Sequence, residues 1–158
     1  MATVEHDVEI EPGSSGDLEG VMKVMNGAFG HRFGEAWTRS QLAGILPMSG
    51  VCLILARERG NHPVGFSLFR TVGDESELLL LGVLPSFHRR GVGRRLLEDF
   101  LERARNEAVA RVHLEVRDGN PAIQMYHSAG FSAVGQRRDY YRAPDGRRFD
   151  AITLARAI

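Results

Sequence analysis

The sequence has a single cysteine, Cys52, among its 158 residues, so no disulfide can form within the chain. It contains no apolar run of the length that export or a membrane span requires. Acidic and basic side chains number 20 each, and the formal net charge of zero provides no general attraction to nucleic acid or to a membrane. The 6 histidines show no paired spacing of metal ligands. These absences predict a cytoplasmic protein that uses no metal and has neither a nucleic acid nor a membrane as its partner.

The length and the patterning predict one domain rather than two. A chain of 158 residues buries about 70% of the surface that its unfolded state exposes. No repeat, low-complexity segment or long linker divides the chain, so residues 1–158 are expected to form a single domain. Strand-like and helix-like apolar patterns occur in the same domain, which indicates the α/β (α+β) class. Strand patterns lie at 51–56, 78–84, 111–117, 131–134 and 149–154, and helical patterns at 18–25, 92–104 and 121–129.

The most informative segment joins an apolar strand to a helix through a basic turn that contains glycine. A helix N-terminus leaves its first amide N–H groups without internal partners and carries about half a positive charge, so phosphates bind there. Gly91 and Gly93 remove the Cβ atoms that would hold a ligand away from the backbone. Together with the nearby positive charges, these glycines predict a site for a pyrophosphate. The arginines of this turn are Arg89, Arg90, Arg94 and Arg95.

Three kinds of phosphate-binding loop fit this outline, and two of them require residues that are absent here. The dinucleotide-binding fingerprint needs a glycine at position 96, where Leu96 stands. The nucleoside-triphosphate loop needs a lysine on the phosphates, whereas the only lysine of the chain is Lys23. The residues alone leave open a third kind of phosphate site or a plain glycine turn before a surface helix.

Residues 88–93 are similar to the acyl-CoA loop of the GNAT superfamily of acetyltransferases, which reads Gln or Arg, two residues, Gly, one residue, then Gly or Ala. His88 stands at the Gln or Arg position, and Gly91 and Gly93 match the small residues. Residues 114–120 and 126–131 resemble the second conserved block of this superfamily. Residues 37–42 and 137–151 look like the ribosomal-protein alanine N-acetyltransferase group within it. The resemblance implies the GNAT fold, with a central mixed, mostly antiparallel twisted sheet that helices flank and that is splayed near the acyl-CoA site.

The resemblance also implies acetyl-CoA as the cosubstrate and assigns residues to its binding. Asn120 precedes Tyr126 by one residue fewer than is usual in the family, so either Asn120 or Gly119 takes the family position. The strand before the loop would hold the thioester carbonyl through its backbone N–H groups. The implied acetyl-CoA-binding residues are Leu81, Gly82, Val83, His88, Arg89, Arg90, Gly91, Val92, Gly93, Arg94, Asn120 and Tyr126.

Acetyl transfer to an amine requires a neutral amine and a proton for the departing thiolate. The resemblance implies that Glu115 draws the amine proton through water and that Tyr126 protonates the sulfur, with Glu77 as an alternative base. At pH 7 an α-amine costs about 1 kcal/mol to deprotonate and a lysine about 4.6 kcal/mol, so a water-linked base suits the α-amine. We therefore expect Tyr140 and Tyr141, with Glu77, to line a slot for a protein N-terminus that begins with alanine, as on a ribosomal protein.

Several alternatives are compatible with the same residues. The acceptor is alternatively a small-molecule amine or a lysine side chain, and a non-catalytic acyl-CoA sensor would bind the cofactor without turnover. By periodicity alone, Glu115 is a solvent-facing strand residue and Tyr126 a core aromatic. Taken by themselves, the arginine clusters also allow RNA binding. For the oligomeric state, the sequence allows a monomer or a homodimer.

Overall fold

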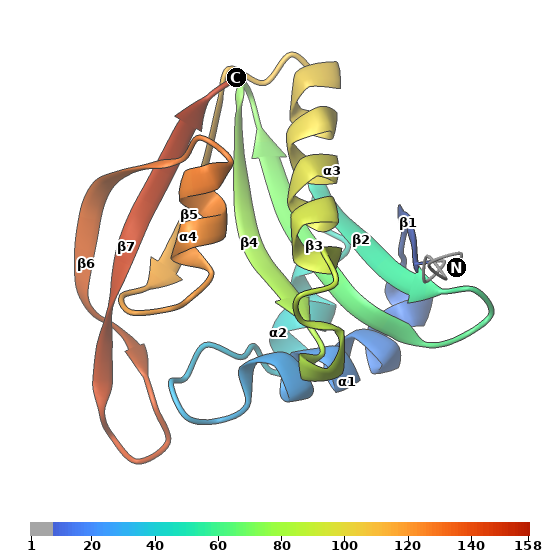
Figure 1. The fold of residues 1–158 in the computed structure, drawn as a ribbon, viewed down its shortest axis with the longest axis horizontal. Helices are drawn as coiled ribbons and strands as arrows, with labels where there is room; N and C mark the ends of the chain where they lie inside the picture. The colour runs from blue at the N-terminus through green and yellow to red at the C-terminus, as the bar shows by residue number, and fades with distance from the viewer. Residues whose placement is uncertain (1–7) are drawn as a thin grey trace, which may run out of the picture.

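The computed structural model describes residues 8–158, which fold into a 7-stranded sheet with helices on both faces (Figure 1). The strand order in the sheet is β1-β2-β3-β4-β5-β7-β6. The strands are β1 Val8–Pro12, β2 Val51–Glu58, β3 Pro63–Val72, β4 Glu75–Val83, β5 Arg111–Arg117, β6 Ser132–Arg142 and β7 Arg148–Ala157. The α-helices are α1 Leu18–Phe29, α2 Arg39–Ile45, α3 Val92–Asn106 and α4 Ile123–Ser128, and the 3-10 turns are η1 Ser15–Asp17 and η2 Pro85–Phe87.

Every element that the apolar pattern predicts is present, but the pattern missed β1, β3 and α2. The other differences concern the ends of elements. Helix α4 begins at Ile123 rather than at Pro121, because the side chain of Asn120 accepts the N–H of Ala122 and forms a turn before the helix. Strand β6 continues to Arg142, well beyond the predicted end at 134, and forms a long hairpin with β7. Nearly all of β6 is exposed, so it carries no alternation of apolar and polar residues that would mark it as a strand.

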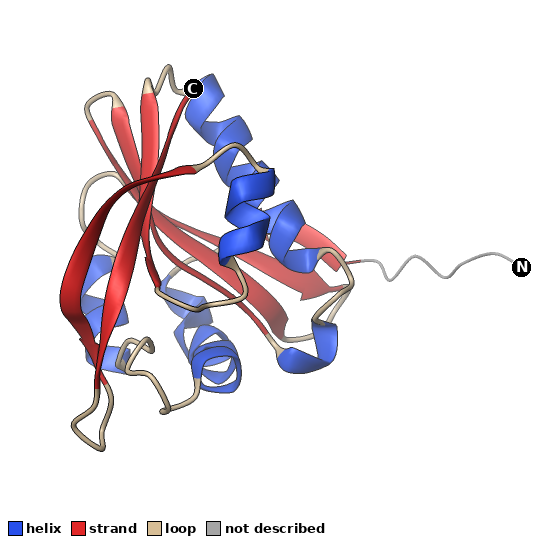
Figure 2. Ribbon diagram, turned by 60° about the vertical axis from the view of Figure 1, so that its left-hand side comes forward, coloured by secondary structure: helices blue, strands red, loops and turns tan. Residues whose placement is uncertain are grey.

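Strand β2 contributes to a hydrophobic core on each face of the sheet. Its residues Leu53 and Leu55 join the core formed with α1 and α2, while Ile54 and Ala56 join the core beneath α3. Successive side chains of a strand point to opposite faces, so one apolar strand serves both cores. Figure 2 shows the sheet nearly edge-on, with helices on both sides of it. Cys52 in β2 is partly buried against the α3 core, where the sequence predicts a strand thiol.

The sheet opens between β4 and β5, the one parallel pair among the described strands. Pairing between these strands begins at Glu75 and Arg111 and stops at Leu78 and Leu114. From 79 to 83, β4 therefore has no strand partner on this side, and the two ribbons diverge (Figure 1). Backbone groups on such an unpaired strand edge can bind an extended ligand as if it were another strand. The splayed, mostly antiparallel mixed sheet that the resemblance implies is confirmed.

Two further observations concern the described residues 8–158. None of their helices is long and apolar enough to cross a membrane. Their His, Cys, Asp and Glu side chains form no group of three or more that is placed to hold a metal ion.

Candidate active site

Two hollows meet at the opening between β4 and β5. The smaller one is a cavity of about 120 Å³ between the end of α1, the loop 30–38, the splayed strands and the tyrosines of β6. The larger one is a groove of about 810 Å³ that runs along β4 to the loop before α3 and to α4. Leu81, Glu35 and Asn120 line both hollows. A molecule that lies in the groove therefore reaches the cavity at these residues.

The groove ends at the N-terminus of α3. Gly91 precedes this helix with a φ of 76°, a left-handed conformation that glycine adopts without a steric penalty, and no side chain caps the helix. Arg89 and Arg94 line the groove beside the uncapped amide groups. Arg95 is engaged elsewhere, because its Nη1 donates a 2.6 Å hydrogen bond to the carbonyl of Val8 in β1. The helix terminus and two arginines fit the phosphates of coenzyme A.

The groove collects most of the residues that the sequence assigns to acetyl-CoA. Nε2 of His88 donates to the carbonyl oxygen of Val83 at 2.9 Å, so His88 helps to shape the turn that follows β4. Arg90 is not among the residues that line the groove, and its guanidinium lies 4.8 Å from the centre of the Phe87 ring. Tyr126 lines the cavity and not the groove. The predicted residues that line the groove are Leu81, Gly82, Val83, His88, Arg89, Gly91, Val92, Gly93, Arg94 and Asn120.

Two predicted carboxylates line the cavity, and they differ in enclosure. The side chain of Glu115 is 10% exposed, and its two oxygens accept hydrogen bonds from Nε of Arg137 at 3.0 Å and from Oγ1 of Thr153 at 2.6 Å. These donors fix the orientation of the carboxylate. Glu77 is 39% exposed, and its Oε2 lies 3.3 Å from Nε2 of His113. Glu115 is thus the more enclosed and the more firmly oriented of the two.

Tyr126 lines the cavity from α4. The residue is 6% exposed, and its ring packs edge-on against Phe131 with 5.9 Å between ring centres. Burial, and secondarily the negative charge of Glu35, raise the pKa of the Tyr126 phenol well above its usual value. The hydroxyl therefore carries its proton throughout the neutral pH range.

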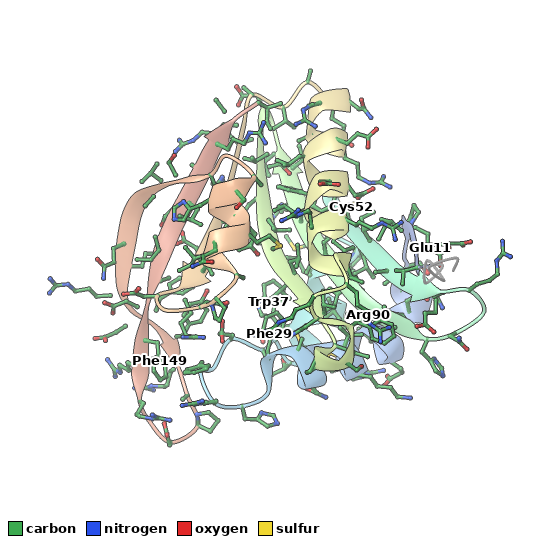
Figure 3. The ribbon with its side chains drawn as sticks, viewed as in Figure 1. Glu11, Phe29, Trp37, Cys52, Arg90 and Phe149 are labelled. Carbon is green, nitrogen blue, oxygen red and sulfur yellow. The ribbon has the colours of Figure 1, made fainter. Side chains whose placement is uncertain are left out.

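Tyr140 and Tyr141 both line the cavity, as the sequence predicts for a substrate slot. Their rings pack edge to face with 4.9 Å between centres, and the Tyr141 hydroxyl donates to the backbone carbonyl of Glu115 at 3.4 Å. Burial raises the pKa of both phenols. Trp37 and Phe29, labelled next to one another in Figure 3, complete the aromatic part of the wall. The lining of the cavity thus combines leucine and aromatic side chains with carboxylates and tyrosine hydroxyls.

Glu35 is the residue of this site that the sequence analysis missed. Its carboxylate is 11% exposed and accepts hydrogen bonds from Nε of Arg117 and from Nδ2 of Asn120, each at 3.1 Å. Asn120 also accepts the N–H of Ala122 at 2.9 Å, so both ends of its amide are engaged within the protein. No local pattern could reveal Glu35, because it lies in an irregular loop and its two partners are 82 and 85 residues away.

Residues 18–131 match the model of the acetyltransferase (GNAT) family. The [ribosomal protein bS18]-alanine N-acetyltransferase of Haemophilus influenzae is 35% identical over 95 residues, which are 60% of this chain and 65% of that protein. The N-alpha-acetyltransferase RimI of Mycobacterium tuberculosis is 44% identical over 102 residues, or 61% of each chain. The chain thus spans less than two thirds of the length of these curated relatives.

Solved structures resemble the chain over nearly its whole length. The ribosomal-protein-S18-alanine N-acetyltransferase of Escherichia coli is 30% identical with a TM-score of 0.85, and the match covers 96% of this chain and 94% of that one. NAA60 of Arabidopsis thaliana in complex with acetyl-CoA has a TM-score of 0.81 at 19% identity, with 96% and 98% covered. The second likeness is one of fold alone.

Proposed function

The chain belongs to the acetyltransferase (GNAT) family, and from this premise we propose that it transfers an acetyl group from acetyl-CoA to the N-terminal α-amine of a protein. The acceptor is an N-terminus that begins with alanine, such as that of a ribosomal protein in the cytoplasm, and both substrates are bound during transfer. The observation that carries the proposal is the meeting of a phosphate-binding groove with a carboxylate-lined cavity between β4 and β5. The names of the relatives in Haemophilus influenzae and Escherichia coli support this choice of acceptor.

The groove suits acetyl-CoA by its chemistry. The phosphates would lie at the N-terminus of α3, where Gly91 admits them to the backbone and Arg89 and Arg94 add positive charge. The pantetheine arm would run along the unpaired edge of β4 at 79–83, whose N–H groups can hold the thioester carbonyl. The cofactor supplies an acetyl thioester at the mouth of the cavity.

Glu115 and Tyr126 line the same cavity and supply the two proton transfers that the reaction needs. The amine nitrogen forms a bond to the acetyl carbon while the carbon–sulfur bond breaks. Glu115 takes the proton that the amine loses, by way of water, and Tyr126 gives its phenolic proton to the departing sulfur. The phenol of Tyr126 carries its proton at neutral pH, so it can act as the donor. Glu77 is the alternative base on the same cavity wall.

The cavity favours a small terminal residue that carries an ammonium group. Three carboxylates line it, those of Glu35, Glu77 and Glu115, and no lysine or arginine is among its lining residues. Arg117 and Arg137 pair with Glu35 and Glu115, so Glu77, which lies beside His113, is the carboxylate best placed to attract a terminal ammonium group. The volume of about 120 Å³ suits a small side chain such as that of alanine. An α-amine is also the easier nucleophile to activate, at about 1 kcal/mol against about 4.6 kcal/mol for lysine at pH 7.

The proposal is tested with two peptides and acetyl-CoA. One peptide has a free N-terminal alanine and no lysine, and the other is blocked at its N-terminus and contains one lysine. The masses of the products show which amine is acetylated. Acetylation of the free terminus is expected. Acetylation of the lysine alone contradicts the proposal, and cofactor binding without any product favours a small-molecule acceptor or a sensor.

A further inference from the structure

Strand β6 carries a bulge in which three residues stand opposite a single residue of β7. Pairing runs from Arg137 opposite Ala151 to Tyr141 opposite Phe149, so residues 138–140 all face Asp150. A bulge of this kind disrupts the ladder, leaves backbone groups unpaired and bends the strand. The backbone groups of the bulge therefore need other partners to hold its shape.

Asp150 supplies such a partner. Its Oδ1 accepts the backbone N–H of Asp139 at 2.9 Å, and its Oδ2 accepts Nε2 of Gln136 at 2.8 Å. Asp139 lies in the middle of the bulge with a φ of 53°, a left-handed conformation that is uncommon for a residue with a side chain. The backbone carbonyl of Asp150 also accepts the N–H of Asp118, just past the end of β5. A single carboxylate thus bridges two positions of the bulged strand.

The bulge has a direct consequence for the cavity. Neighbouring residues of a regular strand point to opposite faces, yet Tyr140 and Tyr141 both line the cavity. Arg137, on the other side of the bulge, donates to the carboxylate of Glu115 at 3.0 Å. The bulge therefore determines where two tyrosines and one arginine meet the site.

We propose that Asp150 is a positioning residue for the acceptor, because its carboxylate holds the bulge in the form that turns Tyr140 and Tyr141 together toward the cavity. Asp150 is not among the residues that line the cavity, so it acts through the tyrosines. The expected effect on KM rests on the proposed function, whereas the effect of Asp150 on the shape of the bulge can be measured without turnover.

The kinetic test compares Asp150→Ala with Asp150→Asn. The alanine variant loses both charge-assisted hydrogen bonds and is expected to raise KM for the alanine-terminated peptide about tenfold. Its KM for acetyl-CoA stays at the parent value, because no residue of β6 lines the groove. Asparagine keeps an oxygen for the N–H of Asp139, so this variant is expected to restore most of the affinity. Asp139→Asn is the matched control, since it keeps the backbone N–H and tolerates the left-handed conformation.

A second readout needs no turnover. Trp37 is the only tryptophan of the chain and lines the cavity with the two tyrosines, so its fluorescence reports on their packing. Asp150→Ala is expected to make Trp37 more accessible to acrylamide, whereas Asp139→Asn leaves the quenching at the parent level. Gln136→Ala removes the other partner of the carboxylate and is expected to raise the peptide KM about threefold, which provides a milder variant if Asp150→Ala does not fold.

The outcomes separate this inference from the proposed function. Parent-like peptide KM and parent-like quenching in Asp150→Ala overturn the inference, and so does an Asp150→Asn variant that behaves like alanine. A parent protein that acetylates no peptide overturns the proposed function, and the quenching comparison then decides the role of Asp150 alone.

Discussion

Replacing Tyr126 by phenylalanine removes one hydroxyl from the cavity and little else. The ring is 6% exposed and packs edge-on against Phe131 at 5.9 Å, and phenylalanine preserves that contact. The free energy of unfolding is therefore expected to change by no more than about 1 kcal/mol. Any large loss of activity then reports on the chemical role of the hydroxyl.

The expected loss in kcat follows from the role of Tyr126 as a general acid. A positioned acid contributes about 100-fold or more to a rate, which corresponds to about 2.7 kcal/mol of transition-state stabilisation. KM for acetyl-CoA is expected to stay within about twofold of the parent, because Tyr126 lines the cavity and not the groove. The variant therefore separates chemistry from cofactor binding.

The assay follows release of the coenzyme A thiol at saturating peptide and acetyl-CoA. A second series uses an acetyl thioester of a more acidic thiol, which needs less help from an acid when it leaves. The deficit of Tyr126→Phe should shrink with this donor. An unchanged kcat, or the same deficit with both thioesters, would refute the role of Tyr126 in protonating the sulfur.

Two further predictions concern stability. Glu35→Ala breaks the enclosed pair with Arg117 and is expected to lower the free energy of unfolding by about 3 kcal/mol. The control Glu9→Ala breaks the exposed pair with Arg59 and is expected to cost less than about 0.5 kcal/mol. Equal urea midpoints for the two variants would contradict this prediction. Burial raises the pKa values of Tyr126 and Tyr141 above their usual value of about 10, so above that pH the unfolded chain has lost protons that the folded chain keeps. The free energy of unfolding should therefore fall as pH rises through about 10, and it should fall less steeply when Tyr126 and Tyr141 are both replaced by phenylalanine. The same dependence of melting temperature on pH in the parent and in this double variant would count against the burial argument.

Apolar periodicity was sufficient to locate the elements that bury one face. Helix α3 places Leu96, Leu97 and Phe100 in the core at helical spacing, and β5 alternates buried Val112 and Leu114 with the partly exposed His113 and Glu115. Such patterns are local, and burial against the sheet enforces them. The predicted positions of these elements are confirmed to within a few residues.

The parts of the site that depend on distant contacts carried no such pattern. Glu35 is positioned by hydrogen bonds to Arg117 and Asn120 from an irregular loop, and the β6 bulge is held by Asp150 from the next strand. Neither contact leaves a local periodicity, because one partner lies far along the chain and the exposed strand has no buried face. Only the resemblance to a family singled out Glu115 among the polar strand residues.

The central claim is that this chain acetylates a terminal α-amine in preference to a lysine. The most direct test is an internal competition, in which one peptide with both a free N-terminal alanine and a single internal lysine is incubated with acetyl-CoA. Tandem mass spectrometry of the singly acetylated product locates the acetyl group. We expect it on the terminal amine in nearly all molecules, whereas a product acetylated mainly on the lysine would contradict the account.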